Sequence, residues 1–88
     1  MPPKALTITE LTRGIKHLLE GNLGRVFLQG EISNLARPNS GHLYFNVKDD
    51  NAQIAGVMFR SVAQRTRFAL ENGLEILLHG RLTVYEPR

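Results

Sequence analysis

The chain has 88 residues, which is enough for one small domain and excludes a catalytic domain folded beside a separate binding domain. Hydrophobic residues make up 42% of it, so disorder throughout is excluded. The absence of Cys excludes disulfides, thiolate metal sites and a cysteine nucleophile, and it fits a reducing compartment. No stretch resembles a signal peptide or a membrane span, so we expect a cytoplasmic protein. The net charge of +3 favours polyanionic partners only mildly.

The first third of the chain predicts an amphipathic helix over residues 6–21. Thr7 and Glu10 have the spacing of a capping box, and Thr9 is the alternative cap. Gly21 is the expected stop. The apolar residues recur at helical spacing, on one stripe formed by Ile8, Leu11, Ile15, Leu18 and Leu19. This stripe must pack against the core or against a partner.

The period of the pattern changes to two at Arg25, which predicts a strand running to Ser33. Its expected inner face consists of Val26, Leu28, Gly30 and Ile32. A glycine inside a strand permits the sharp bend that a small barrel needs, although a simple bulge is the alternative for Gly30. A polar loop is expected over residues 34–41, where Pro38 precedes a run of turn-forming residues.

Residues 42–48 alternate cleanly and predict a second strand. Leu43, Phe45 and Val47 should point into the core. The outward residues are then His42, Tyr44, Asn46 and Lys48. A tight turn follows, and residues 53–59 return as the other half of a hairpin, although the pattern leaves open which of them face inward.

The last part of the chain contains a short connector of helical character over residues 61–70 and a final strand over residues 74–85, interrupted at Gly80. This order matches the OB-fold, a five-stranded Greek-key barrel in which a helix links strands three and four. We therefore expect an all-β domain with an added N-terminal α-helix, truncated before strand five. Residues 1–88 would form one domain, with a disordered lead over 1–5 and an incomplete barrel over 25–88.

An incomplete barrel leaves the edges of strands three and four without partners. Unpaired edges recruit another chain or a swapped segment. Self-association or strand swapping of the chain is therefore expected.

Four stretches carry a resemblance to a known family, and a fifth at the C-terminus fits it. They are Gly30-Glu31-Ile32-Ser33-Asn34, Ser40-Gly41-His42-Leu43-Tyr44-Phe45, Lys48-Asp49-Asp50 with Ala52-Gln53-Ile54, Met58-Phe59-Arg60, and Tyr85-Glu86-Pro87-Arg88. Together they resemble the N-terminal domain of the exodeoxyribonuclease VII large subunit, in order and spacing over nearly the whole chain.

The resemblance implies an OB-type domain that positions single-stranded DNA for hydrolysis by a catalytic region further along a longer bacterial protein. It also implies partners, namely the rest of the large subunit and a small helical subunit. No catalytic residue, no metal ligand and no cofactor are expected within these residues, and no membrane association is expected.

Six residues are candidates for contacting nucleic acid. Tyr44 on the outward face could stack on an unpaired base, or it could be a cross-strand packing residue. His42 could stack or hydrogen-bond to a base, or it could be an ordinary surface histidine. The cations that could track phosphates, or simply be solvated, are Arg37, Lys48, Arg60 and Arg81.

Other chemistry is poorly supported by the sequence. The three histidines are far apart and no Cys accompanies them, so their spacing fits no local zinc motif. Asp49 and Asp50 are the only adjacent carboxylates, and their position in a hairpin turn explains them better than a metal-dependent nuclease site does. The remaining alternatives to single-stranded DNA binding are an RNA-binding module of the anticodon type and a protein-assembly module.

Overall fold

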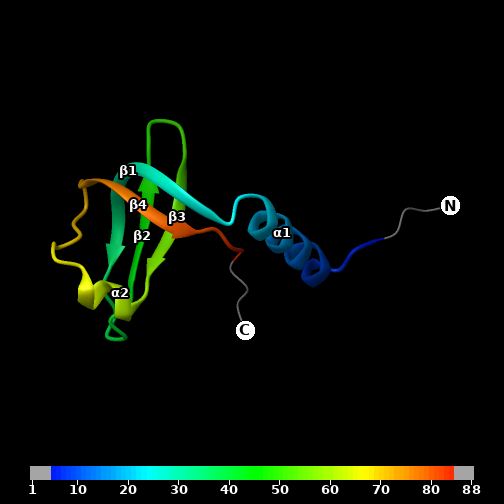
Figure 1. The fold of residues 1–88 in the computed structure, drawn as a ribbon, viewed down its shortest axis with the longest axis horizontal. Helices are drawn as coiled ribbons and strands as arrows, with labels where there is room; N and C mark the ends of the chain where they lie inside the picture. The colour runs from blue at the N-terminus through cyan, green and yellow to red at the C-terminus, as the bar shows by residue number, and fades with distance from the viewer. Residues whose placement is uncertain (1–4, 85–88) are drawn as a thin grey trace. The chain divides into compact units, whose positions relative to one another are not determined.

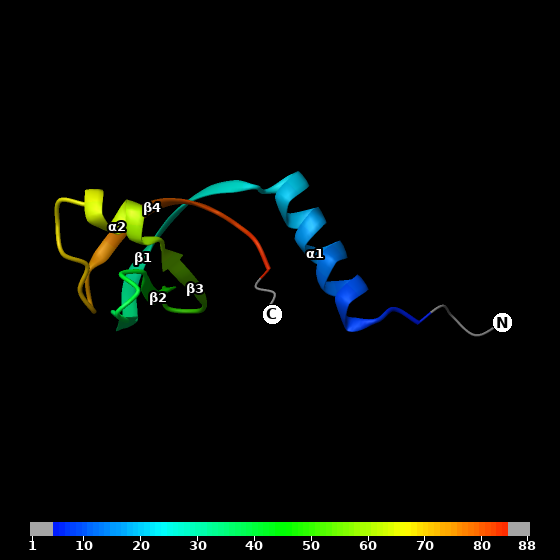
Figure 2. The same ribbon diagram turned by 90° about the horizontal axis from the view of Figure 1, so that it is seen from below.

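The computed structural model describes residues 5–84, and the expectations for residues 1–4 and 85–88 lie outside them. The elements are α1 (Ile8–Asn22), β1 (Arg25–Ala36), β2 (Leu43–Lys48), β3 (Gln53–Met58), α2 (Arg60–Arg65) and β4 (Glu75–Arg81) (Figure 1). The sheet has the strand order β3-β2-β1-β4. Its antiparallel strands curl into a half-barrel with α2 between β3 and β4 (Figures 1 and 2). The expected fold class, an OB-fold lacking strand five among the described residues, is confirmed.

The chain divides into two compact units. The larger unit spans Leu28–Leu78 and contains β2, β3, α2 and most of β1 and β4. The second unit, described over residues 5–27 and 79–84, contains α1 with the first residues of β1 and the last residues of β4.

The N-terminal end of α1 forms as the sequence predicts. The backbone N–H of Glu10 donates to Thr7 Oγ1 at 3.0 Å, and the N–H of Thr7 donates to Glu10 Oε1 at 3.1 Å. These two bonds are a complete capping box, so Thr7, not Thr9, is the cap.

The predicted stop at Gly21 is wrong. Gly21 remains inside α1, which continues to Asn22. The N–H groups of Leu23 and Gly24 both donate to the carbonyl oxygen of Leu19 at 2.8 Å. Gly24 has φ +47, the left-handed conformation that ends helices. The helix therefore ends at the glycine that adopts a positive φ, a property that the sequence pattern does not distinguish between two nearby glycines.

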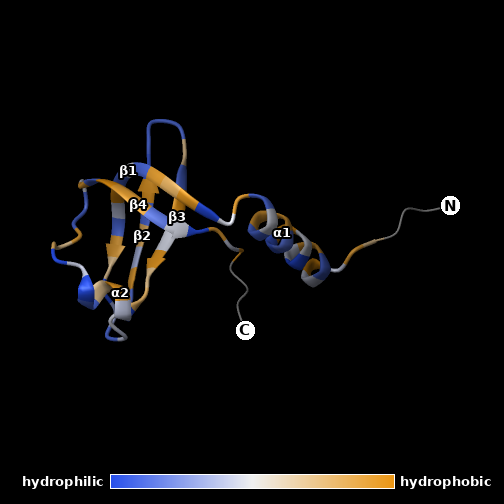
Figure 3. Ribbon diagram, in the orientation of Figure 1, coloured by the Kyte–Doolittle hydropathy of each residue, from blue (hydrophilic) through white to orange (hydrophobic). Residues whose placement is uncertain are grey.

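The apolar stripe of α1 is exposed in the described part of the chain. Ile8 is 79% exposed and Leu18 is 64% exposed, and α1 has no buried residue. Figure 3 shows apolar segments on α1 interleaved with polar ones. Among residues 5–84, no helix has the length and apolar character needed to cross a membrane.

The core of the larger unit confirms the predicted alternation in β1 and β2. Its buried members are Ile32, Phe45, Val47 and Leu70. Leu35, Leu43, Met58, Ile76 and Leu78 pack around them. Because Phe45 and Val47 are buried while Tyr44 is 47% exposed, the inward and outward residues of β2 are those expected from the sequence.

Two glycines allow the strands around β2 to pack closely. A Cβ atom at Gly30 would lie 2.7 Å from Val47 Cγ1 and 2.8 Å from the carbonyl oxygen of Lys48. A Cβ atom at Gly56 would lie 2.9 Å from the ring of Phe45. Gly56 is paired with Phe45 across β2 and β3, so Gly56 and its alternate neighbours face inward. This settles the face of β3 that the sequence left open.

The expectation of a loop from residue 34 is wrong, because β1 continues to Ala36. The register with β2 shifts between Ser33 and Ala36, and Asn34 has φ 52. Asparagine tolerates this left-handed conformation, and the resulting bulge inserts one residue while keeping Leu35 on the core side. The N–H of Leu35 is satisfied by Asn72 Oδ1 at 3.0 Å.

The other ends of the helices and strands differ less from those expected from the sequence. The structure begins β2 at Leu43 and ends β3 at Met58, each within one residue of the expectation. The short connector helix is α2, which begins at Arg60. The final strand is shorter than expected: β4 ends at Arg81, although the N–H of Leu82 still donates to the carbonyl oxygen of Gly24 at 2.8 Å.

Candidate nucleic-acid interface

Tyr44 lies on β2, which is placed between β1 and β3 in the sheet. Its side chain is on the face turned away from the core. Its neighbours in the register are Ala36 on β1 and Val57 on β3. Neither neighbour is aromatic, and 47% of Tyr44 remains exposed. A partly exposed tyrosine ring on a strand offers a flat surface to an incoming base.

Two further rows of outward side chains continue this face along β2. Asn46 is paired with Ser33 on β1 and with Ala55 on β3. The amide of Asn46 and the hydroxyl of Ser33 can both donate and accept hydrogen bonds. Asn46 was expected on this face, but neither Asn46 nor Ser33 was among the predicted contact residues. Strand alternation was the signal for both, but only the register shows that they form one row.

The third row contains Lys48, whose neighbours are Glu31 on β1 and Gln53 on β3. Lys48 Nζ lies 3.7 Å from Glu31 Oε2, and the two side chains are 44% and 40% exposed. An ion pair this exposed is weak, so the cation remains available to a phosphate in competition with Glu31. We call the outward residues of these three rows the β2 face: Glu31, Ser33, Ala36, Tyr44, Asn46, Lys48, Gln53, Ala55 and Val57.

His42 does not point freely from the surface. Its Nδ1 atom accepts a hydrogen bond from the backbone N–H of Arg60 at 2.8 Å. Its ring also packs edge-to-face on Phe59, with ring centroids 5.6 Å apart and an interplanar angle of 89°. These contacts join the start of β2 to the start of α2. In the neutral imidazole, Nε2 then carries the proton and is the nitrogen left to contact a ligand.

Arg60 lies next to His42, and its aliphatic stem rests on the turn before β2. A Cβ atom at Gly41, which has φ +88, would lie 2.8 Å from Arg60 Cδ. The absent side chain at Gly41 thus leaves space for the arginine. Both residues are therefore held at the same end of the larger unit as the start of β2.

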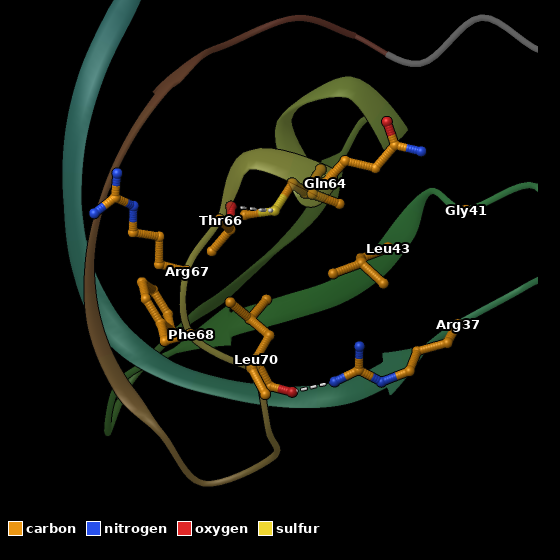
Figure 4. Close-up of a pocket in the computed structure, with 11 residues that line it drawn as sticks. Arg37, Gly41, Leu43, Gln64, Thr66, Arg67, Phe68 and Leu70 are labelled. Carbon is orange, nitrogen blue, oxygen red and sulfur yellow. Dashed lines mark hydrogen bonds between the residues drawn. The ribbon is translucent and has the colours of Figure 1, made fainter.

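Arg37 lines a cavity of about 480 Å³ in the larger unit (Figure 4). Its guanidinium donates to the carbonyl oxygen of Leu70, from the loop before β4. Leu43 and Leu70 give this cavity apolar walls, and Arg67 lies on its rim. Arg37 therefore supports the loop, and it has other donors left for an anion.

Arg81 differs from the other five candidates. It is exposed at the end of β4 and belongs to the second unit, whereas Arg37, His42, Tyr44, Lys48 and Arg60 all belong to the larger unit. Within the larger unit, the structure brings His42 into contact with Arg60 and places Tyr44 and Lys48 on the β2 face.

The two adjacent aspartates form turn structure, as predicted. Asp49 Oδ1 accepts hydrogen bonds from the N–H groups of Asn51 at 2.8 Å and Ala52 at 2.9 Å. These two bonds lower the pKa of the Asp49 carboxyl below its usual value, the bond from Asn51 contributing most. Within residues 5–84 the structure contains no group of three or more His, Asp or Glu side chains that could hold a metal ion.

Comparison with known proteins agrees with this architecture. Residues 6–88 match the family model of the OB-fold nucleic acid binding domain. The chain is also similar to proteins named exodeoxyribonuclease 7 large subunit. It is 48% identical to the one from Sodalis glossinidius, over 99% of this chain and 19% of that protein. It is 50% identical to the one from Rhodopirellula baltica, over 96% of this chain and 19% of that protein.

A third relative of the same name, from Geobacter metallireducens, is 48% identical over 97% of this chain. The chain spans about a fifth of the length of these relatives. The earlier resemblance to the exodeoxyribonuclease VII large subunit is therefore confirmed at the level of sequence similarity. The family match, the strand order and the helix between β3 and β4 lead to one identification: the chain belongs to the family of OB-fold nucleic-acid-binding domains.

Proposed function

We propose that this chain is a single-stranded-DNA-binding domain of an exodeoxyribonuclease 7 large subunit, where it positions DNA for hydrolysis by a catalytic region elsewhere in the protein. The observation that carries the proposal is the exposed ring of Tyr44 in the first row of the β2 face. Its position supports stacking on an unpaired base, which is typical of OB-folds that bind single strands.

Stacking and charge would share the binding energy. Base stacking on one aromatic ring contributes about 1 to 3 kcal/mol. Lys48 on the β2 face, with Arg37 and Arg60 in the larger unit, provides cations for phosphates. Each phosphate neutralised on a single strand contributes about −0.7 to the slope of log K against log salt concentration. Binding by the larger unit should therefore weaken strongly as salt rises.

Sequence preference should be small, because stacking and phosphate contacts discriminate little among bases. Ser33 and Asn46 add a hydrogen-bonding row beside Tyr44 and could contact the edge of a stacked base. One row of this kind supports a mild base preference, not a recognition sequence.

Protein partners follow from the two edges of the sheet. In the described residues, β3 and β4 are the outer strands, so each has one side without a strand partner. We propose that a further segment of the large subunit, or a second copy of the chain, pairs with these edges. In the full-length protein, the partners would be the remainder of the large subunit and a small subunit.

The test is fluorescence anisotropy with a labelled oligo-dT at two salt concentrations. Tyr44→Ala should weaken binding about 5- to 150-fold, the equivalent of about 1 to 3 kcal/mol. Tyr44→Phe keeps the ring and should bind almost as well as wild type. Val62→Ala is the control, because Val62 is 43% exposed on α2, outside the β2 face.

The same assay decides between DNA and RNA. Only an RNA-binding domain gains from contacts to the 2′-hydroxyl, so an oligo-U of equal length should bind no more tightly than oligo-dT. Tighter RNA binding would replace the proposal with an RNA-binding module. If neither oligomer binds and Tyr44→Ala alters only the oligomeric state, the domain serves protein assembly.

A further inference from the structure

Phe27 and His79 form a stacked aromatic pair across β1 and β4. Their ring centroids are 4.5 Å apart and the rings are inclined by 13°. Phe27 is 71% exposed, and His79 is exposed as well. Both residues belong to the second unit, and both are on the outward side of their strands, since the alternate residues Val26 and Gly80 are less exposed.

The register of these strands places two arginines beside the stacked rings. The N–H of Leu82 donates to the carbonyl oxygen of Gly24, and Phe27 faces His79. In an antiparallel pair, this register sets Arg25 opposite Arg81. Arg25 and Arg81 therefore form the next outward row after Phe27 and His79, and both are exposed.

Two like charges directly opposite each other on one face of a sheet are destabilising. No ion pair of Arg25 or Arg81 occurs among residues 5–84. The carboxylate of Glu20, also in the second unit, accepts a hydrogen bond from Thr83 Oγ1 at 3.5 Å. An anion bound between the two guanidinium groups would offset their repulsion.

We propose that Arg25, Phe27, His79 and Arg81 form a second contact site for single-stranded nucleic acid, which we call the β1–β4 cluster. A base extends the ring stack on the open face of Phe27, and the adjoining phosphates bind the two arginines. The proposal deepens the proposed function and rests on it. An exposed flat stack beside an unneutralised arginine pair fits a base next to a phosphate, because the stack matches the base and the charges match the phosphate.

The cluster explains an exposed residue that the core does not require. Phe27 points outward from a strand whose core side is filled by other residues. A single exposed apolar side chain is common on protein surfaces and does not by itself indicate a binding site. Here, however, the ring is held parallel to a second ring and next to two cations. An ordinary exposed apolar residue would not need to be stacked on a second ring beside two cations.

The first experiment compares Phe27→Ala with Leu77→Ala by anisotropy, using oligo-dT of about 16 nucleotides, the upper site size of an OB-fold. Leu77 is the control, because it is 72% exposed and lies on β4 two residues before His79, outside the ring stack. Phe27→Ala should weaken binding about 5- to 150-fold, whereas Leu77→Ala should leave it within twofold. Circular dichroism and thermal unfolding establish that both variants fold. Equal effects of the two substitutions would overturn the proposal.

The second experiment uses the absence of Trp from the sequence. Phe27→Trp introduces a single indole that can still stack, so its emission should be quenched when oligo-dT is added. Leu77→Trp is the control and should change little. Unchanged emission of Phe27→Trp while anisotropy reports bound DNA would overturn the proposal.

The third experiment concerns charge. Arg25→Gln and Arg81→Gln should each make the slope of log K against log salt shallower by about 0.7, the value for one phosphate contact on a single strand. An unchanged slope in both variants would contradict the phosphate contacts.

Failure of this site can be distinguished from failure of the proposed function. If wild type binds oligo-dT and Tyr44→Ala weakens it, but Phe27→Ala, Arg25→Gln and Arg81→Gln all have no effect, only the further site is wrong. If wild type does not bind single strands, both proposals are wrong. If Phe27→Ala changes only the sedimentation of the protein, the cluster is a protein interface and the proposal is overturned.

Discussion

The imidazole Nδ1 of His42 and the backbone N–H of Arg60 are joined by a hydrogen bond of 2.8 Å. This bond connects the residue preceding β2 with the first residue of α2, whose N-cap residue, Phe59, makes no side-chain cap bond. An N–H at the start of a helix has no partner within the helix. His42 therefore acts as a cap supplied from a distant part of the chain.

His42→Ala should lower the free energy of unfolding by about 0.5 to 1.5 kcal/mol through the lost hydrogen bond. Loss of the edge-to-face contact with Phe59 adds a comparable amount. Urea denaturation measures the change. His42→Asn, which retains an acceptor, is the comparison variant and should recover part of the stability. Unchanged stability of His42→Ala would show that the contact does not support α2.

Gly30→Ala should destabilise the larger unit by about 1 to 3 kcal/mol, the range for overpacking a core. The added Cβ would meet the backbone oxygen of Lys48 at 2.8 Å, and a backbone atom cannot move aside as easily as a side chain end. Gly14→Ala is the matched control, because a Cβ there has nothing within 4 Å. It should instead stabilise α1 by about 0.5 to 1 kcal/mol. Thermal unfolding that ranks the two variants the other way would contradict the packing of β1 against β2.

The lowered pKa of Asp49 predicts a pH dependence with a defined sign. The folded-state pKa lies below the usual value of 3.8, because the carboxylate accepts two backbone hydrogen bonds. The stabilisation is therefore fully present above pH 3.8 and is lost as the pH falls through the folded-state pKa. Carbon-detected NMR titration should place the Asp49 midpoint below 3.8, and removing the accepting carboxylate with Asp49→Ala should abolish this acid sensitivity. A midpoint at or above 3.8 would contradict the turn geometry.

Within residues 5–84, β3 and β4 each have one edge without a strand partner, which predicts concentration-dependent self-association of the 88-residue chain. Sedimentation velocity over a wide range of protein concentration measures it. A single monomeric species at the highest concentration would argue against strand pairing between copies.

The alternation of β2 was predictable because a half-buried strand has a strict period of two, so the sequence alone placed Tyr44 outward and Phe45 inward. The face of β3 was not predictable. Its small and apolar residues fit both faces, and only pairing of Gly56 with Phe45 decides between them. The capping box of α1 was predictable because it is local, whereas the choice between Gly21 and Gly24 as the stop depends on backbone conformation.

The candidate site was predictable in part for the same reason. Tyr44 and Lys48 follow from alternation within one strand. The partners of His42 and Arg37 come from Arg60 and Leu70, far along the chain, so no local pattern indicates them. The stack of Phe27 on His79 depends on the register of two strands at opposite ends of the sequence.

The most direct test of the central claim is an NMR titration of ¹⁵N-labelled protein with unlabelled oligo-dT. We expect the largest amide shifts in the larger unit at Tyr44, Asn46 and Lys48 and at their register neighbours on β1 and β3. Shifts confined to α1, or a spectrum unchanged along β2 at saturating oligomer, would contradict the assignment of the β2 face to single-stranded DNA.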